Sequence, residues 1–313
     1  MHVAIIGAGM AGLACAMRLS EAGHAVSLFD KGRGPGGRMA TRRMEAGGRT
    51  VHFDHGAQYF TAHDPVFARQ VEAWERDGIA ARWPAAGSET WVGTPGMNAP
   101  VRAMAERLGV SFSSRVESIR RVGPLWTLDG DNVPDAAFDA VVVAVPAEQA
   151  GALLMQHDGA MAELADATVS EPCWTLMIAF ESPLEGAPDT IRDHGAIGWA
   201  ARNASKPQRG DTECWVIQAN SEWSAAHLEE EGEAIGPLLH DALAGAAGAP
   251  LPSVLAMSAH RWRYARSGKA GPGHLWDAEK RLGVCGDWLI APRVEAAYLS
   301  GYSLAGTMLG QST

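Results

Sequence analysis

The hydrophobic pattern of the first thirty residues predicts a strand, a helix and a second strand. Residues 3–6 form a short apolar run, which predicts a buried strand. Residues 10–22 predict a helix that Gly23 ends, and the apolar run at residues 26–29 predicts a second strand, parallel to the first. The chain therefore begins with a strand–helix–strand unit of the kind that builds α/β folds.

Between residues 65 and 145 the pattern predicts a mixture of helices and short strands. The predicted elements are helices at residues 65–77 and 96–108, strands at 80–83, 90–93, 110–112, 116–119, 126–128 and 138–145, and a turn at 129–131. The run from Asp139 to Pro146 contains an unbroken apolar stretch from Ala140 to Val145, which is mostly β-branched. Such a run is typical of a strand that is buried on both faces.

Residues 167–272 carry shorter apolar stretches that are separated by turns rich in proline and glycine. The predicted elements are strands at residues 173–180, 196–200, 214–219 and 254–262, with a helix at 229–244. This series indicates an antiparallel sheet that the helix covers. A strand at 282–287 and a helix of small residues at 294–306, able to pack close to the first sheet, follow. The predicted fold class is therefore α/β plus α+β.

Composition and charge narrow the class of protein. The 313 residues are 47% hydrophobic and 20% charged, which is typical of a soluble globular protein. A formal net charge of −10 argues against nucleic acid or an anionic membrane surface as the partner. No apolar run approaches the ~20 residues of a membrane span, and a strand follows Met1 at once, so we expect a cytoplasmic protein without a signal peptide. The four cysteines form no CxxC pair, so neither a metal site nor a redox dithiol is indicated.

The glycines of the first turn have the spacing that binds a dinucleotide. Gly7 allows a sharp turn out of the strand, Gly9 lets the backbone approach a pyrophosphate, and Gly12 lets the helix pack against the sheet. Asp30 ends the second strand, where a carboxylate accepts hydrogen bonds from a ribose diol. Glycine-rich turns also occur for purely structural reasons, but here the strand, the helix and the acid all stand where the motif requires them. The sequence therefore predicts a bound dinucleotide.

A second glycine-rich loop, at residues 31–43, follows Asp30 and contains four arginines. One interpretation is a solvated basic loop. The other is that its glycines bring backbone N–H groups and Arg38 close to a diphosphate. A nicotinamide dehydrogenase does not need this second glycine-rich loop at the diphosphate. The GGR sequence after the acid resembles flavoproteins of the glutathione-reductase-like class.

Three motifs together resemble the renalase family, a branch of the monoamine-oxidase-like flavoproteins. They are GGRM at residues 36–39, DHGAQYFT at 54–61, and the GD pair at 286–287 with its following helix; HRWRYA at 260–265 is similar as well. The resemblance implies a resident FAD, bound without a covalent link because no cysteine lies between Cys214 and Cys285. It also implies a Rossmann-like FAD-binding domain of residues 1–64, 96–166 and 273–313, and a discontinuous substrate domain of residues 65–95 and 167–272 on the antiparallel sheet.

The motifs and the resemblance together define the expected contacts to FAD. In the family, the GAQY stretch passes beside the isoalloxazine ring, and the residue at Val116 contacts the adenine through its main chain. Asp287 is expected to accept a hydrogen bond from a ribityl hydroxyl. The full set of expected cofactor contacts is Gly7, Gly9, Ala11, Gly12, Asp30, Lys31, Gly37, Arg38, His55, Gly56, Ala57, Gln58, Val116, Gly286, Asp287 and Ala296.

Aromatic and histidine side chains are the candidates for the reaction pocket. Trp174, Trp199 and Trp215 lie on neighbouring predicted strands, but the facing side of each depends on a register that the sequence does not reveal. Most tryptophans pack in cores, which is the alternative for each of them. His55 stands where animal relatives are expected to carry an apolar residue, and it is either a hydrogen-bonded structural residue or a catalytic one. The catalytic candidates are His55, Tyr59, Trp199, Trp215 and Trp288.

The resemblance implies a reaction in which nicotinamide is the substrate. The family oxidises misplaced-hydride isomers of NAD(P)H, the 2- and 6-dihydronicotinamides, to NAD(P)+, and O2 takes the electrons and forms H2O2. An amine oxidase or a carotenoid-desaturase-like enzyme on the same scaffold is one alternative, and it would need a lysine near the flavin N5 or a long apolar tunnel. A non-enzymatic flavin-binding module and a nicotinamide-only dehydrogenase are the others. The sequence leaves the oligomeric state open. None of the four lysines stands in a recognised motif: Lys31, Lys206, Lys269 and Lys280.

Overall fold

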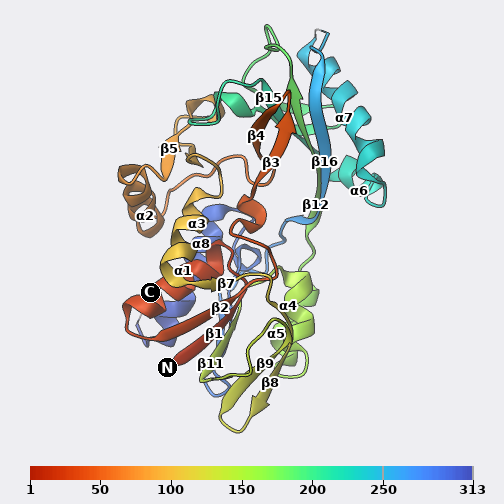
Figure 1. Cartoon of the computed structure of the whole chain (residues 1–313). Coiled ribbons are helices and arrows are strands. Elements are labelled where there is room, and N and C mark those ends of the chain that lie inside the picture. The colour runs from red at the N-terminus through yellow and green to blue at the C-terminus, as the bar shows by residue number, and fades with distance from the viewer. Residues whose placement is uncertain (249, 312–313) are drawn as a thin grey trace.

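Two large sheets organise the chain, and the first of them is mainly parallel (Figure 1). This computed structural model describes residues 1–248 and 250–311. The strand order is β17-β18-β11-β1-β2-β7, and only β17 at one edge is antiparallel to its neighbour. The predicted Rossmann-like architecture is confirmed. The strands are β1 (His2–Ile6), β2 (Ala25–Phe29), β7 (Val110–Ser111), β11 (Ala140–Val143), β17 (Leu275–Asp277) and β18 (Leu282–Val284).

Alternate residues of the central strands face two different cores. Val3 and Ile5 of β1 pack against a layer of helices that contains α1, α3 and α8, whereas Ala4 and Ile6 face α4 and α5. The sheet is therefore buried on both faces, as the continuous apolar run at β11 predicted. The helices are α1 (Met10–Glu21), α3 (Ala99–Leu108), α4 (Ala147–Leu154), α5 (Gly159–Asp166) and α8 (Val294–Met308).

Helices α1 and α8 pack so closely that their contact requires glycine. A Cβ atom on Gly301 of α8 would stand 1.9 Å from the carbonyl oxygen of Ala11 in α1. A Cβ atom on Gly12 would stand 2.0 Å from the carbonyl oxygen of Gly7. Both neighbours are backbone atoms, which have little freedom to move aside. The predicted helix of small residues therefore lies where its composition requires, against the first turn of the chain.

A three-stranded antiparallel sheet covers the second face, and here two boundaries differ from the prediction. It consists of β8 (Arg115–Val122), β9 (Leu125–Asp131) and β10 (Ala137–Phe138). The turn predicted at 129–131 is wrong because these residues continue β9; Gly130 lies at a bulge, where its φ of 151° suits glycine. The strand predicted over 138–145 is interrupted at Asp139, whose carboxylate accepts a hydrogen bond from the His2 amide at 2.7 Å.

The second large sheet has five antiparallel strands in the order β13-β14-β15-β12-β16. Helix α7 covers one of its faces, where Ile235 and Leu239 pack against Ile178 and Trp215. The antiparallel sheet and its covering helix were predicted, whereas β13 and α6 were not. The elements are β12 (Glu171–Phe180), β13 (Thr190–His194), β14 (Ile197–Arg202), β15 (Cys214–Ala219), β16 (Val254–Arg266), α6 (Ser221–Ala226) and α7 (Gly232–Ala247).

A hairpin that the sequence analysis missed packs against the opposite face of this sheet. It consists of β3 (Thr41–Ala46) and β4 (Arg49–Asp54), and its first residues were assigned to the basic loop. Phe53 and Val51 pack against Met177 and Val216. In Figure 1 the hairpin lies beside β15 and β16. Residues 41–54 thus pack on the antiparallel sheet as a separate two-stranded sheet, although the predicted domain limits place them with the cofactor.

The segment at residues 65–95 packs beside the helices of the parallel sheet. It contains α2 (Pro65–Arg76), β5 (Ala80–Arg82) and β6 (Trp91–Gly93), all close to their predicted positions. Phe67 and Trp74 share a core with residues of α1, α3 and α8. The domain limits themselves stay a prediction. Within residues 1–248 and 250–311, no helix is both long and apolar enough to cross a lipid bilayer.

We predict that Gly301→Ala lowers the free energy of unfolding by about 1–3 kcal/mol, because the added methyl group overlaps the backbone of α1. Gly245→Ala is the matched control: Gly245 lies inside α7, and a Cβ atom there would meet no heavy atom within 4 Å. The control should gain about 0.5–1 kcal/mol from helix propensity. Urea unfolding of both variants measures this, and equal stabilities would contradict the close packing.

Candidate functional site

A cavity of about 1430 Å³ runs from the first glycine turn to the antiparallel sheet. It exceeds the ~300–1,000 Å³ typical of pockets for drug-sized ligands, so it has room for a dinucleotide together with a second molecule. The carboxyl ends of the parallel strands open into it, as in other open α/β sheets. The predicted site residues that line the cavity are Gly7, Gly9, Ala11, Asp30, Lys31, Gly37, Arg38, Gly56, Ala57, Gln58, Tyr59, Val116, Trp199, Gly286 and Asp287.

The glycine turn forms one end of the cavity. Gly7 has a φ of 103°, and a Cβ atom there would stand 2.4 Å from the carbonyl oxygen of Ala144. A Cβ atom on Gly9 would meet no protein atom within 4 Å and would project into the cavity. Asp30 is held by the backbone, because its carboxylate accepts hydrogen bonds from the amides of Ala8 at 2.8 Å and Gly32 at 2.7 Å. This geometry suits a phosphate and a ribose. The contacts of these residues to a cofactor stay a prediction.

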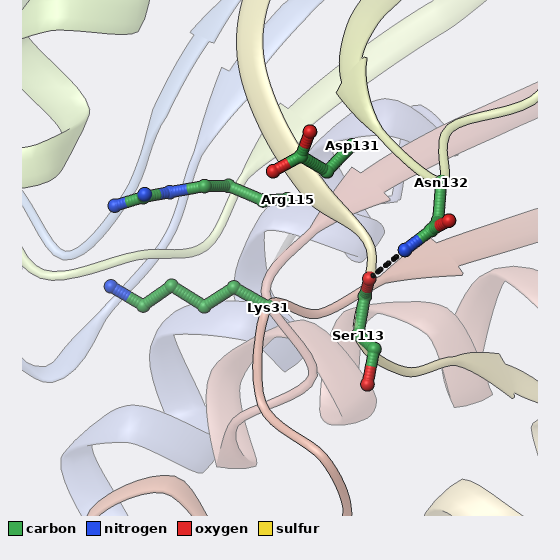
Figure 2. A pocket seen from close by; sticks show the side chains of 5 residues that line it. All are labelled: Lys31, Ser113, Arg115, Asp131 and Asn132. Carbon is green, nitrogen blue, oxygen red and sulfur yellow. Dashed lines mark hydrogen bonds between the residues drawn. The ribbon is translucent and has the colours of Figure 1, made fainter.

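Beyond Asp30, two cations stand side by side at the edge of the cavity (Figure 2). Lys31 donates a hydrogen bond to Gln149 Oε1 at 2.7 Å, and its pKa is lowered by burial and by the charge of Arg115. Both side chains also border a side pocket of about 470 Å³ with Ser113, Asp131 and Asn132. Val116 follows Arg115 and lines the main cavity. Lys31 and Arg115 together place two positive charges on the cavity wall near Asp30.

In the middle of the cavity, Arg38 and Asp287 form a bidentate ion pair. The two N···O distances are 2.7 and 2.6 Å, and Ser267 Oγ donates a third hydrogen bond to Asp287 at 3.0 Å. The sequence analysis placed Arg38 at a diphosphate and Asp287 at a ribityl hydroxyl. The structure brings the two side chains together on the cavity wall, and their individual contacts to a cofactor stay a prediction.

The GAQY stretch lies directly against the Arg38 loop. A Cβ atom on Gly56 would stand 2.0 Å from the carbonyl oxygen of Arg38, and the Ala57 amide donates to that oxygen at 2.8 Å. From the antiparallel sheet, Gln218 donates to the Gly56 carbonyl oxygen at 2.7 Å. The stretch is therefore held between two layers of the protein, with its small residues at the cavity surface.

Aromatic side chains form the wall of the cavity beyond this stretch. The rings of Tyr59 and Trp199 are 5.3 Å apart between centroids, and the guanidinium of Arg192 lies 4.5 Å from the Trp199 ring. Trp262 lines the same space and donates its indole N–H to the His55 carbonyl oxygen at 2.9 Å. This end of the cavity offers flat apolar surfaces to a planar ligand.

Five predicted site residues do not line the cavity. Trp215 faces α7, because Gln218 of the same strand faces the cavity and side chains alternate along a strand. Trp288 is fully buried in the core beneath the parallel sheet, where its indole N–H donates to the Val145 carbonyl oxygen at 3.2 Å. Gly12 and Ala296 are buried and allow close packing rather than contact with the cavity.

His55, the fifth of these residues, is buried behind the GAQY stretch. Its ring centroid lies 5.1 Å from those of both His260 and Trp262, and its Nδ1 has no hydrogen-bond partner. Burial, the neighbouring His260 and the charge of Arg42 lower the pKa of His55 to about 4. His55 is thus neutral at physiological pH, and the structure places its ring in a packing role.

The sequence analysis missed Arg192 and Gln218, which both line the cavity. Arg192 lies on β13, a polar strand that the hydrophobic pattern did not indicate. Gln218 lies two positions beyond Val216 on a predicted strand, and side chains two positions apart point to the same face of a sheet. This alternation could have placed Gln218 on the cavity face once that face was known.

The site can now be compared with known proteins. Residues 5–73 match the description of an NAD(P)-binding Rossmann-like domain. Residues 84–309, more than half of the chain, match the description of a flavin-containing amine oxidoreductase. The chain belongs to the flavin-containing amine oxidoreductase family. The renalase branch in particular is not established by these matches.

Solved structures share the fold over nearly the whole chain. A putative protoporphyrinogen oxidase from Exiguobacterium sp. 255-15 has a TM-score of 0.79 at 12% identity, and the match covers 99% of each chain. A putrescine oxidase redesigned in its cofactor binding has a TM-score of 0.77 at 14% identity, also with 99% coverage of each. Cyclohexylamine oxidase from Brevibacterium oxydans IH-35A has a TM-score of 0.66 at 12% identity, with 99% and 98% coverage.

Curated relatives match over a short segment. A 4,4'-diapophytoene desaturase from Staphylococcus aureus is 51% identical over 39 residues, which are 12% of this chain and 8% of the desaturase. The chain thus spans a small fraction of this relative, and the match carries no information on substrate.

The residues of the cavity fit the FAD that the family uses. Gly9 and Gly37 leave open space where a side chain would stand, and both line the cavity. Asp30 is placed for a ribose, and the basic residues Lys31, Arg38 and Arg115 are placed for an anionic ligand. The small residues of the GAQY stretch leave a flat surface at the junction of the two sheets. FAD is therefore the cofactor of this protein.

We predict that the purified protein is yellow and that Asp30→Ala and Asp287→Ala each weaken FAD binding by about tenfold or more, since each removes a charged hydrogen-bonding partner. Asp129→Ala is the control, because Asp129 pairs with Arg120 on the exposed surface of β9. Fluorescence titration of the FAD-free protein measures the affinities. Unchanged affinity in both cavity variants would contradict the assigned positions.

A second prediction concerns acid stability. The pKa of His55 is about 4 in the fold and about 6.5 in an unfolded chain, so the unfolded state binds more protons between these values. The free energy of unfolding therefore falls as the pH drops from about 6.5 to about 4. Burial lowers the pKa of His260 as well, which adds to the same trend; Arg42 and Asp54 are the other charged groups that act on His55.

His55→Phe should flatten this dependence, because it keeps a ring and removes the titrating group. His52→Phe is the matched control, since His52 lies on β4, which ends one residue before His55, and its side chain is exposed. Urea unfolding between pH 4 and pH 7 measures both. An unaltered slope in His55→Phe would show that other groups control the acid stability.

Proposed function

We propose that this protein is an FAD-dependent oxidase of dihydronicotinamides, which takes hydride from the 2- or 6-dihydro isomers of NAD(P)H and yields NAD(P)+ and H2O2. The observation that carries this proposal is the guanidinium of Arg192, which lies 4.5 Å from the ring of Trp199 at the aromatic end of the cavity. An amine substrate is an ammonium ion at neutral pH, and aromatic faces bind it through cation–π attraction. Here a protein cation already occupies that position.

The contacts of two carboxylates that line the cavity, Glu295 and Asp287, support the same choice. Glu295 accepts hydrogen bonds from the backbone amides of His63 and Asp64 at 2.6 and 2.7 Å, and Asp287 is paired with Arg38. Both carboxylates therefore already have hydrogen-bond donors within the protein. An uncharged dihydropyridine ring needs no such partner, and it can stack against Tyr59 and Trp199.

Several arginines line this cavity, and their charge suits the phosphates of a dinucleotide. Arg261 and Arg263 direct their guanidinium groups toward the Leu228 carbonyl oxygen and Glu229, outside the aromatic end. Arg192, Arg266 and Arg293 also line the cavity. The motifs that resemble the renalase family point to the same class of substrate.

The chemistry requires little from the protein beyond positioning. FAD, when bound, supplies the hydride acceptor and passes the electrons to O2. Tyr59 and Trp199 hold the dihydropyridine ring flat, and Gly56 and Ala57 let it lie close to the opposite wall. The surrounding aromatic side chains limit access of water. The non-covalent attachment of FAD is part of this proposal.

We predict that anaerobic mixing with 2- or 6-dihydro-NAD bleaches the flavin absorbance within seconds, whereas benzylamine and ordinary NADH reduce it at least about a hundredfold more slowly. Benzylamine is a cation, and ordinary NADH carries its hydride on a different ring carbon from the two isomers. Stopped-flow absorbance follows the reduction. Fast reduction by benzylamine alone would favour an amine oxidase. No reduction by any member of the panel would favour a binding module.

A further inference from the structure

An ion cluster without contact to solvent lies behind the GAQY stretch. The side chains of Asp54, Lys206 and Arg209 are each 0% exposed. Asp54 Oδ2 accepts hydrogen bonds from Arg209 Nη2 at 2.7 Å and Nε at 3.0 Å, and from Lys206 Nζ at 3.3 Å. Asp54 Oδ1 accepts from Thr41 Oγ1 at 2.8 Å and the Met97 amide at 2.9 Å. None of the three charged side chains lines the cavity.

The cluster buries two positive charges against one negative charge. The two cations hold the pKa of Asp54 down to about 2 although burial acts in the opposite direction. Burial lowers the pKa of Lys206 to about 8. Replacing buried ions by apolar groups of similar volume is often neutral or stabilising, so a cluster with excess charge is a poor way to stabilise a fold. Arg209 alone already pairs Asp54 with two hydrogen bonds, which leaves Lys206 without a necessary role in that pair.

Lys206 connects the cluster to the cavity wall. Its Nζ donates to Gln58 Oε1 at 3.1 Å, and Gln58 Nε2 donates in turn to the carbonyl oxygens of Gly56 and Asp54. With a donor at Oε1, the amide can present only its NH₂ group to these two carbonyls. Gln58 is 5% exposed and lines the cavity with Gly56 and Ala57. The ammonium group and the two carbonyl oxygens together hold the amide that braces the turn in one orientation.

The loop that carries Lys206 connects β14 to β15 of the antiparallel sheet. It also contacts β4, which precedes the GAQY stretch in the chain, and β6. Asn203 donates to the His52 carbonyl oxygen at 2.7 Å, and Arg209 donates to the Gly93 carbonyl oxygen at 2.8 Å. The loop therefore ties the end of β4 and the end of β6 to β14 and β15. Lys206 is the residue of this loop that forms a hydrogen bond to Gln58 of the cavity wall.

We propose that Lys206 is a positioning residue for the cofactor site: its ammonium group orients the Gln58 amide and so holds the backbone of residues 56–58 against the flavin of FAD. Lys206 acts through Gln58 and touches neither cofactor nor substrate. This role is independent of the proposed substrate, because it concerns the FAD site alone.

The test compares Lys206→Met, Gln58→Leu and the double variant as holoenzymes. Lys206→Met keeps the apolar stem and removes the ammonium, and Asp54 retains Arg209. We expect FAD to dissociate about tenfold faster from each single variant and the visible circular dichroism of the bound flavin to change in the same way. The double variant should resemble the single variants, because both substitutions break one linear chain of contacts. Flavin fluorescence on release and the dichroism spectrum need no substrate.

Lys280→Met is the matched control. Lys280 forms ion pairs with Asp158 at 2.7 Å and Asp277 at 2.9 Å and does not line the cavity, so its loss should leave FAD release and the dichroism unchanged. Additive effects in the double variant, or wild-type release and dichroism in Lys206→Met, would overturn the proposal. If Lys206→Met does not fold, Gln58→Leu decides alone, because it leaves the ion cluster intact: wild-type flavin properties in that variant contradict the proposal, and altered ones support it.

Discussion

The site depends on one constraint, which is that the carboxyl ends of parallel strands meet at a single edge of a sheet. Strands β1, β2 and β18 come from opposite ends of the chain, yet each ends at this edge. The glycine turn follows β1, Asp30 follows β2, and Asp287 follows β18. The sheet therefore gathers residues that are more than 250 positions apart in the sequence into one cavity, and close packing of α1 against α8 holds the two chain ends together.

The antiparallel sheet contributes the other half of the cavity through the alternation of its side chains. One face of the sheet packs beneath α7, and the other carries the β3–β4 hairpin and the cavity wall. Trp199 and Gln218 are cross-strand partners on the cavity face, whereas Trp174 and Trp215 point toward α7. The face of the sheet on which a tryptophan lies thus decides its role. Trp199 can touch a ligand, whereas Trp174 and Trp215 stabilise the core.

Electrostatics distinguishes the two ends of the cavity from each other. At the ribose end, Lys31 and Arg115 stand beside Asp30, which suits a nucleotide. At the aromatic end, Arg192 covers the Trp199 ring. Elsewhere along the cavity, the carboxylates of Glu295 and Asp287 already have hydrogen-bond partners. The fold is shared with amine oxidases, so the difference in substrate that we propose rests on these side chains rather than on the architecture.

Local sequence patterns determined the fold class, most of the strands and helices, and the cofactor. The glycine spacing, Asp30 and the run at β11 are short-range signals, because backbone conformation and burial of a strand act within a few residues. Only the tertiary structure decided which tryptophans face the cavity, that the hairpin at residues 41–54 packs on the antiparallel sheet, and that Asp54, Lys206 and Arg209 share a buried cluster. Each of these depends on strand register or on contacts between residues far apart in the chain, and a shift of one residue in register exchanges the two faces of a strand.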